Sequence, residues 1–451
     1  MRIVIAGDDE IAFRLAEHLM TDHAVSLICS EKASSRTDRL DVETIVGAIT
    51  SNASLRNAKV EDADLFISAS SFDELNLVAC VLGKRLGAKK TVCFLFRSEF
   101  HSVVGSPESL AESLGIDKVI RPAEQLAKEI LRIVAVPGAL DVEAFVGGKV
   151  KLFRHAVEPD SPVTRGPLKE VGLPGGVVLV MVRRGDEIFI PKGHTRLRPG
   201  DKVTAMGNPA GMNRLLFKHL KSEAQSRHAR RVCVVGAGEV GLAVALGLED
   251  AAWRVKVIET SKTRCEEISR VLNSLVLHGD GADLQLLEEE HIADDAVLIA
   301  VTVSDEKNLL VSLLAKQLGL PRIITRASSS SNERLFEVVG VDVVRSATGA
   351  AVRSVVKDIV ESSTELLAEL EHGDAMVLEL SLASNYPATP LFDLRVPEFV
   401  IVGAILRAQS VIIPKGSDEV RGGDRILIFC TREYEEQARG FFSRSPEKES
   451  R

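Results

Sequence analysis

The chain contains the same sequence pattern twice, and this internal repeat restricts its possible folds more than any other feature. Residues 2–19, RIVIAGDDEIAFRLAEHL, align with residues 231–248, RVCVVGAGEVGLAVALGL, at an offset of 229 residues. Residues 190–201 and 413–424, which both begin with IPKG and end with GD, align at an offset of 223. A period this long in a chain of 451 residues indicates a duplicated pair of domains, not a solenoid of short repeats.

The first part of each half alternates apolar strands with helical patterns. RIVIAG at 2–7 is a continuous apolar run that ends in glycine, which is typical of a strand buried on both faces of a parallel sheet. The second part of each half consists of short alternating runs separated by proline and glycine, which favours a small β-rich domain. We therefore expect an α/β protein with two doubly wound, Rossmann-like domains, each followed by a small α+β domain, as a tandem duplication. The expected boundaries are 1–120 and 230–348 for the Rossmann-like domains, and 121–225 and 349–445 for the small domains with their junction helices.

The sequence GAGEVG at 236–241 has the spacing of a dinucleotide-binding loop and lies between a predicted strand and a predicted helix, as that loop requires. Gly236 permits a tight turn, Gly238 lets the backbone approach a pyrophosphate, and Gly241 lets the helix pack closely on the strand. Free N–H groups at the start of the helix would then face the phosphates. Glu259 ends the next predicted strand, where a carboxylate accepts a hydrogen bond from a ribose 2′-hydroxyl. The second half is therefore predicted to bind a nucleotide.

The acid at position 259 also restricts which nucleotide fits. A carboxylate there disfavours a 2′-phosphate, so NADP is not expected. It does not distinguish NAD(H) from ATP or ADP, because all of these carry the same adenosine ribose.

The corresponding loop of the first half departs from this pattern. Gly7 is kept, but Asp9 and Ala12 replace the second and third glycines. Cys29 or Ser30, depending on the alignment, replaces the ribose acid. These changes predict a first site that is weakened or lost.

Charge adds to this prediction. Asp8, Asp9 and Glu10 would place three carboxylates where a pyrophosphate should lie, and Ala48 stands where the second half has Asp280. Each like-charge contact at ~4 Å costs about 1 kcal/mol in water and more at a partly buried site. A cation bound at this acidic loop and a merely solvated loop are the alternative interpretations.

Polar residues also follow later strands of the second half. Thr302 and Ser304 lie at the carboxyl end of one predicted strand, the edge at which open α/β sheets bind ligands, although a strand end with a helix cap has the same pattern. Arg326 ends the next strand and could contact a phosphate or pair with an acid at an interface. The matching places in the first half are expected at Ser70, Asp73 and Arg97.

Composition and the missing motifs exclude several classes of protein. A net charge of −8 with 4% aromatic residues argues against a nucleic-acid-binding protein. No apolar run approaches the ~20 residues of a membrane span, and the start of the chain lacks the basic region of a signal peptide, so we expect a cytoplasmic protein. The histidines and the six cysteines show no metal-ligand spacing, and no acid–base constellation stands out. We expect no metal site and no catalytic residue.

Taken together, the motifs resemble a known family. GAGEVG, the strand-end Glu259, HGD at 278–280 and AVTVSDEKNLLVSLLAKQLG at 300–319 resemble the nucleotide-binding domain of the regulator-of-potassium-conductance (RCK, or KTN) family. The IPKG…GD segments resemble the C-terminal domain that follows it, and VPGAL at 136–140 with GGKVKL at 147–152 strengthens the likeness. Two such pairs in one chain are similar to the peripheral subunits of bacterial Trk potassium uptake systems.

The resemblance implies a regulatory subunit that binds NAD(H), with ATP or ADP as the alternative. It would assemble on the cytoplasmic face of an integral membrane potassium-translocating subunit and gate potassium entry, and the duplication favours a homodimer or homotetramer. The nucleotide contacts would be Gly236, Ala237, Gly238, Glu239, Val240, Gly241, Glu259, Asp280, Thr302 and Arg326. The first-half counterpart, predicted above to be weakened or lost, would consist of Gly7, Asp8, Asp9, Glu10, Ile11, Ser70, Asp73 and Arg97.

Some alternatives stay open at this point. The junction helices at 121–136 and 349–363 are either core helices of their own domains or, as in the family, interface helices. The chain could also be a nucleotide-sensing regulator of another transporter. An NAD-dependent oxidoreductase with a duplicated Rossmann unit is a third possibility, but the sequence offers it no catalytic groups.

Overall fold

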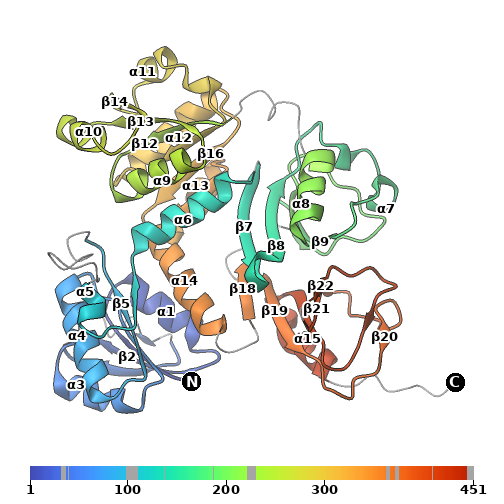
Figure 1. Cartoon of the computed structure of the whole chain (residues 1–451), viewed down its shortest axis with the longest axis horizontal. Coiled ribbons are helices and arrows are strands. Elements are labelled where there is room, and N and C mark those ends of the chain that lie inside the picture. The colour runs from blue at the N-terminus through green and yellow to red at the C-terminus, as the bar shows by residue number, and fades with distance from the viewer. Residues whose placement is uncertain are drawn as a thin grey trace.

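The computed structural model describes residues 1–31, 37–38, 40–97, 110–136, 138–185, 187–220, 230–361, 366–370, 375–408 and 410–443. Within these residues the two halves repeat one another, each with a parallel sheet followed by an antiparallel sheet (Figure 1). The four-domain α/β architecture that the sequence repeat predicts is confirmed.

The first half opens with a parallel six-stranded sheet in the order β3-β2-β1-β4-β5-β6. Its strands are β1 (Arg2–Ala6), β2 (Ala24–Cys29), β3 (Glu43–Val46), β4 (Leu65–Ser68), β5 (Lys90–Phe94) and β6 (Lys118–Ile120). Its helices are α1 (Glu10–Leu19), α3 (Asn52–Asn57), α4 (Asp73–Leu86) and α5 (Leu110–Ser113). The strand order reverses between β1 and β4, which is the switch point at which doubly wound folds bind ligands.

The second half repeats this sheet in the order β14-β13-β12-β15-β16-β17. Its strands are β12 (Arg231–Val235), β13 (Arg254–Glu259), β14 (Leu275–His278), β15 (Val297–Ala300), β16 (Ile323–Ala327) and β17 (Val343–Ser346). Its helices are α9 (Glu239–Asp250), α10 (Lys262–Ile268), α11 (Leu284–Glu289), α12 (Asp305–Gln317) and α13 (Ser330–Val339). The switch point lies between β12 and β15.

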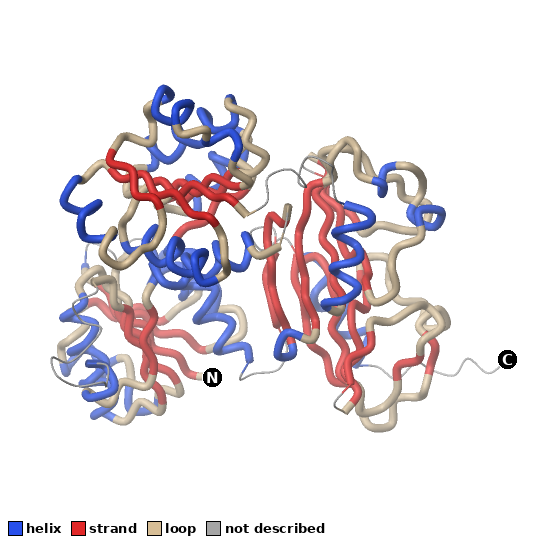
Figure 2. The backbone as a smooth tube through the Cα atoms, turned by 45° about the horizontal axis from the view of Figure 1, so that its top comes forward, coloured by secondary structure: helices blue, strands red, loops and turns tan. Residues whose placement is uncertain are grey.

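The small domains are antiparallel five-stranded sheets with equivalent orders, β10-β9-β11-β8-β7 and β22-β21-β24-β19-β18. The first contains β7 (Ala139–Phe145), β8 (Val150–Ala156), β9 (Val177–Arg184), β10 (Glu187–Phe189), β11 (Lys202–Gly207), α7 (Leu168–Val171) and α8 (Pro209–Leu215). The second contains β18 (Leu366–Leu370), β19 (Ala375–Ser381), β21 (Val400–Arg407), β22 (Ser410–Ile412), β24 (Arg425–Thr431), α15 (Glu435–Ser443) and the small pair β20 (Thr389–Pro390) and β23 (Glu419–Val420). The two sheets lie beside each other in Figure 2 and share one apolar cluster that includes Met181, Met206, Leu427 and Phe429.

The junction helices α6 (Pro122–Val134) and α14 (Ala347–Glu361) are exchanged between the halves (Figure 1). Leu126, Ile130 and Ile133 on α6 join the core of the second Rossmann-like domain, where α6 packs against α9. Val352 and Val355 on α14 join the core of the first, where α14 packs against α1. The junction helices therefore form an interface between the two halves of the chain.

Candidate functional site

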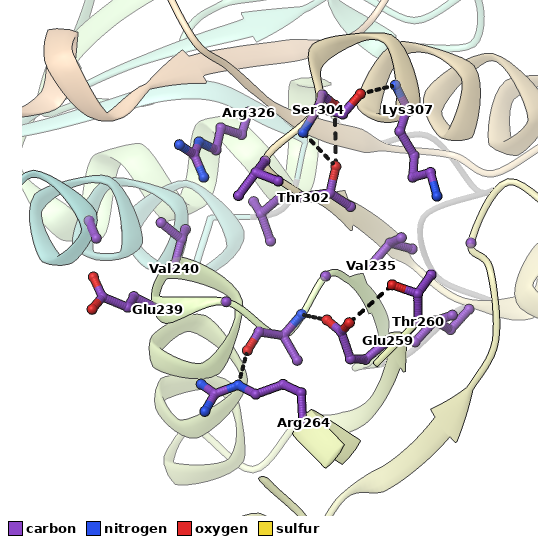
Figure 3. Close-up of a pocket in the computed structure, with 18 of the residues that line it drawn as sticks. Val235, Glu239, Val240, Glu259, Thr260, Arg264, Thr302, Ser304, Lys307 and Arg326 are labelled. Carbon is purple, nitrogen blue, oxygen red and sulfur yellow. Dashed lines mark hydrogen bonds between the residues drawn. The ribbon is translucent and has the colours of Figure 1, made fainter. Parts of the chain in front are cut away.

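A cavity of about 780 Å³ lies at the carboxyl ends of β12, β13, β15 and β16, at the switch point of the second Rossmann-like domain (Figure 3). Nine of the ten residues predicted for the second-half site line it; Gly241 does not. Gly241 lies behind the loop, and a Cβ there would collide with the carbonyl oxygen of Gly236. The structure thus brings the predicted residues together, while their contacts with a nucleotide remain a prediction.

The glycine loop leaves the start of α9 open toward the cavity. Gly236 has φ +99°, and a Cβ there would lie 3.0 Å from the backbone of Thr302, so glycine is required at this turn. Gly238 is the N-cap residue of α9 and supplies no side-chain hydrogen bond. The first N–H groups of the helix therefore have no side-chain acceptor from the cap, which is the arrangement that binds phosphate.

Glu259 is held in one position by hydrogen bonds. Its Oε2 accepts from the Ala237 N–H at 2.8 Å, and its Oε1 accepts from the Ser261 N–H at 2.8 Å. Burial opposes ionisation, but these hydrogen bonds outweigh it and lower the pKa of Glu259 below its ordinary value. The group is therefore a carboxylate at neutral pH and can accept a hydrogen bond from a ribose hydroxyl.

Arg264 is a cavity residue that the sequence analysis missed. It lies beside Glu259 in Figure 3, and its Nε donates to the Ala237 carbonyl at 2.8 Å while its Nη1 pairs with Glu267 at 2.9 Å. Arg264 lies in the first turn of α10, shortly after Glu259 at the end of β13. Its short distance from Glu259 along the chain could have indicated that it lies near the site.

Asn308, which is fully buried, ties together the ends of β15 and β16. Its Nδ2 donates to the carbonyls of Thr302 and Arg326, both at 3.0 Å, and its Oδ1 accepts from the Thr302 N–H at 2.9 Å and hydroxyl at 2.7 Å. Asn76 makes the same contacts in the first half. The sequence analysis did not single out this asparagine, although it recurs in the aligned segments.

Arg326 supplies a cation to the cavity. Its side chain is half-buried, and it makes no hydrogen bond or ion pair with the residues that the structure describes. Burial lowers its pKa, and Asp305 opposes that shift. Lys307, by contrast, is paired with Asp280 at 2.9 Å. Because an unpaired half-buried guanidinium is costly, Arg326 is suited to receive an anion from a ligand.

The first half has no arginine at the position that corresponds to Arg326. Asn76 holds the Phe94 carbonyl as Asn308 holds that of Arg326, so fully buried Phe94 occupies the place of Arg326. The expectation that Arg97 matches Arg326 is therefore wrong. Arg97 lies beyond the strand, where it pairs with Glu74.

Ser70 lies at the position in the first half that corresponds to Thr302. The Ser70 N–H donates to Asn76 at 2.8 Å, as that of Thr302 does to Asn308. Asp73 accepts from the N–H groups of Phe96 and Arg97 at 2.9 and 2.8 Å, so its carboxylate is used within the protein. None of the eight predicted first-half residues lines the cavity.

Asp9 is the N-cap residue of α1, and its carboxylate binds the start of the helix, where the glycine-loop pattern would place a phosphate. Its Oδ1 accepts from the N–H groups of Ile11 at 3.1 Å and Ala12 at 3.2 Å, and its Oδ2 accepts from the Ser71 hydroxyl at 3.4 Å. Cys29, not Ser30, takes the place of Glu259, because the Gly47 N–H binds its carbonyl as the Gly279 N–H binds that of Glu259. N–H groups at the start of α1 are thus already hydrogen-bonded within the protein. This adds to the charge repulsion expected from the sequence.

The carboxyl group of Asp9, the N-cap residue of α1, should titrate near neutral pH. Burial raises the pKa of Asp9 from 3.8 to about 6, against the opposing hydrogen bonds from Ala12 and Ile11. The folded state therefore holds a proton that the unfolded state has lost, and stability falls as the pH rises from about 4 through about 6.

Asp9→Asn keeps the hydrogen-bond acceptor and removes the titration. We expect its stability relative to the parent to rise by ~1–3 kcal/mol between pH 4.5 and 7.5, measured by urea denaturation. A difference that stays constant over this range would contradict the assignment.

The first half nevertheless contributes to the second-half cavity. Phe96 follows β5, and Pro122 and Ala123 begin α6; all three line the cavity, together with Ala347 and Thr348 at the start of α14. The cavity therefore lies where the two exchanged helices begin. Sequence spacing could not reveal this, because it depends on how the halves pack.

The described residues contain no group of three or more histidine, cysteine, aspartate or glutamate side chains arranged to hold a metal ion. No helix among them has the length and apolar character needed to cross a membrane.

The chain is similar in sequence to known proteins. The family model described as the TrkA-N domain matches residues 3–122 and 232–347, and that of the TrkA-C domain matches residues 152–217. A protein named Trk system potassium uptake protein TrkA homolog 2, from Methanosarcina mazei, is 34% identical over 442 residues, covering 95% of this chain and 97% of that protein. The Trk system potassium uptake protein TrkA homolog of Archaeoglobus fulgidus is 36% identical over 434 residues, with the same coverage of 95% and 97%.

Solved structures share the fold. The GsuK RCK domain superposes with a TM-score of 0.58 at 18% identity, covering 98% of this chain and 94% of that one. The GsuK channel bound to NAD gives 0.59 at 18% identity, covering 98% and 78%. At such identities the likeness shows the arrangement of the domains.

Proposed function

The chain belongs to the TrkA family of Trk system potassium uptake proteins, and from this premise we propose that it is a regulatory subunit that senses an adenine nucleotide. It would assemble, as a homodimer or homotetramer, on the cytoplasmic face of an integral membrane potassium-translocating subunit. Nucleotide bound in the second half would change the arrangement of the domains and so gate potassium entry. This coupling requires that the nucleotide bind the two arrangements with different affinities.

The observation that carries the proposal is the contrast between the two loops. In the second half an open helix start, an ionised Glu259 and the unpaired Arg326 converge on one cavity. In the first half Asp9 fills the helix start and Phe94 replaces the arginine. We therefore assign nucleotide binding to the second half alone.

NAD(H) is the favoured ligand, and ATP or ADP is the alternative. The GsuK channel, which shares this fold, is described with NAD bound. The contacts proposed for this chain are Gly236, Ala237, Gly238, Glu239, Val240, Glu259, Asp280, Thr302 and Arg326, with Gly241 supporting the loop. Ionised Glu259 should repel the 2′-phosphate of NADP.

Potassium flux tests the function. The membrane subunit would be reconstituted in liposomes, and flux measured with and without this chain and with each nucleotide. We expect the chain to make flux depend on NAD(H) or on an adenine nucleotide, and the Gly238→Asp variant to bind the membrane subunit without conferring that dependence. Flux that is unaffected by the chain at every nucleotide concentration would refute the proposal.

A further inference from the structure

A buried arginine of the second Rossmann-like domain holds the link between α6 and β7 of the first half. Arg322 immediately precedes β16 and is 7% exposed. Its guanidinium donates to the carbonyls of Ile133 at 3.0 Å and Val136 at 3.2 Å, and also to that of Ala139. One side chain thus binds the end of α6 and the start of β7 together.

A second arginine, on the neighbouring strand, binds the next residues of β7. Arg345 on β17 is also 7% exposed; it donates to the Leu140 carbonyl at 3.2 Å and pairs with Asp141 at 3.0 Å. Gly138, which lies between the segments that Arg322 and Arg345 contact, has φ +71°, a backbone conformation that glycine adopts without strain. Arg322 and Arg345 together are called the hinge clamp below.

The elements that carry the hinge clamp also reach the nucleotide cavity. Arg326 lies at the other end of β16 from Arg322 and is the direct register partner of Arg345. α6 begins with Pro122 and Ala123 in the cavity wall and ends, 13 residues or about 20 Å later, in the clamp. Helix α6 therefore contacts the cavity at its start and the hinge clamp, next to the first small domain, at its end.

The first half lacks both features. Phe94 stands in the place of Arg326, and its register partner Ile120 stands in the place of Arg345. By the same alignment Lys90, which is exposed, stands in the place of Arg322. The cavity cation and the hinge clamp are present together in one half and replaced together in the other.

We propose that the hinge clamp couples the nucleotide state of the second Rossmann-like domain to the orientation of the first small domain. The inference rests on the proposed function. Because the clamp fixes the end of α6 and the start of β7 to β16 and β17, a ligand that moves Arg326 or the start of α6 also moves the sheet that begins with β7. Arg322 and Arg345 are positioning residues in this scheme, because neither lines the cavity.

Spin-label distances test the coupling in the full-length chain. One label would be placed at Lys169→Cys on α7 of the first small domain and one at Glu288→Cys on α11; both positions are exposed. The six native cysteines are buried and should stay unlabelled. The distance distribution would be measured by double electron–electron resonance with and without NADH, ATP and ADP, and affinity by calorimetry.

In the parent chain we expect the bound nucleotide to shift the distance distribution. Arg322→Lys keeps the charge but replaces the planar fork of two terminal nitrogens by a single ammonium; it should bind nucleotide within about threefold of the parent but lose the shift. Arg345→Lys should behave in the same way and serves if the first variant folds poorly. Lys90→Met is the matched control and should keep both affinity and shift.

The outcomes separate this inference from the function on which it rests. A parent chain that binds nucleotide without any shift, or clamp variants that shift like the parent, would overturn the coupling and leave nucleotide sensing intact. A parent chain that binds no nucleotide would overturn both.

Discussion

Gly238→Asp is expected to abolish nucleotide binding without unfolding the chain. A Cβ at position 238 meets no atom within 4 Å, and φ there is −64°, so the side chain is accommodated. The new carboxylate should accept the N–H groups of Val240 and Gly241, as Asp9 does in α1. It would place a negative charge where the phosphate is expected to bind. We expect the binding free energy to weaken by ~3 kcal/mol or more, which corresponds to at least about 100-fold weaker binding.

Calorimetric titration and thermal unfolding together test this result. The midpoint of unfolding should stay level or rise, because an N-cap aspartate stabilises a helix by ~1 kcal/mol. Gly238→Ala adds bulk without charge and should weaken binding less. Gly236→Ala is the structural contrast and should lower stability, since φ is +99° and Thr302 lies 3.0 Å from the added atom. If Gly238→Asp binds as tightly as the parent, the glycine loop is not the phosphate site.

Arg326→Gln is expected to weaken nucleotide binding by about 10- to 150-fold, because a hydrogen bond to a charged group contributes ~1.5–3 kcal/mol. The fold should be unaffected, since Asn308 binds the main-chain carbonyl of residue 326 and the guanidinium has no partner among the described residues. Lys307→Gln is the matched control: that ammonium is engaged by Asp280, so its loss should cost less.

Binding affinity and thermal stability of Arg326→Gln test two different roles of the arginine. Unchanged affinity in Arg326→Gln would show that the arginine does not contact the ligand. A lowered unfolding midpoint would show instead that its side chain supports the fold.

Much of the fold could be predicted because the repeat and the buried strands leave few alternatives. The run RIVIAG and its copy at 231–236 fix the central strand of each sheet, and glycines at defined spacing fix the turn into α9. The second-half cavity follows, because the carboxyl ends of parallel strands meet at one edge.

The parts that could not be predicted depend on packing between distant segments. The apolar face of α6 predicts a buried helix, but not that it is buried in the opposite half. The offset between the halves grows from 229 at Gly7 to 232 at Ser70, and the strand that follows shows that Phe94, not Arg97, matches Arg326. The carboxylate of Asp9 was predicted to repel a phosphate. That it also accepts hydrogen bonds from the first N–H groups of α1 follows only from the structure.

The stoichiometry of nucleotide binding tests the central claim most directly. NADH, NAD, ATP and ADP would each be titrated calorimetrically into the parent chain and into Gly238→Asp. We predict one site per chain for the nucleotide that binds best, and no binding to Gly238→Asp. Two sites per chain, with one surviving the substitution, would contradict the account, because the first half would then bind nucleotide in spite of Asp9.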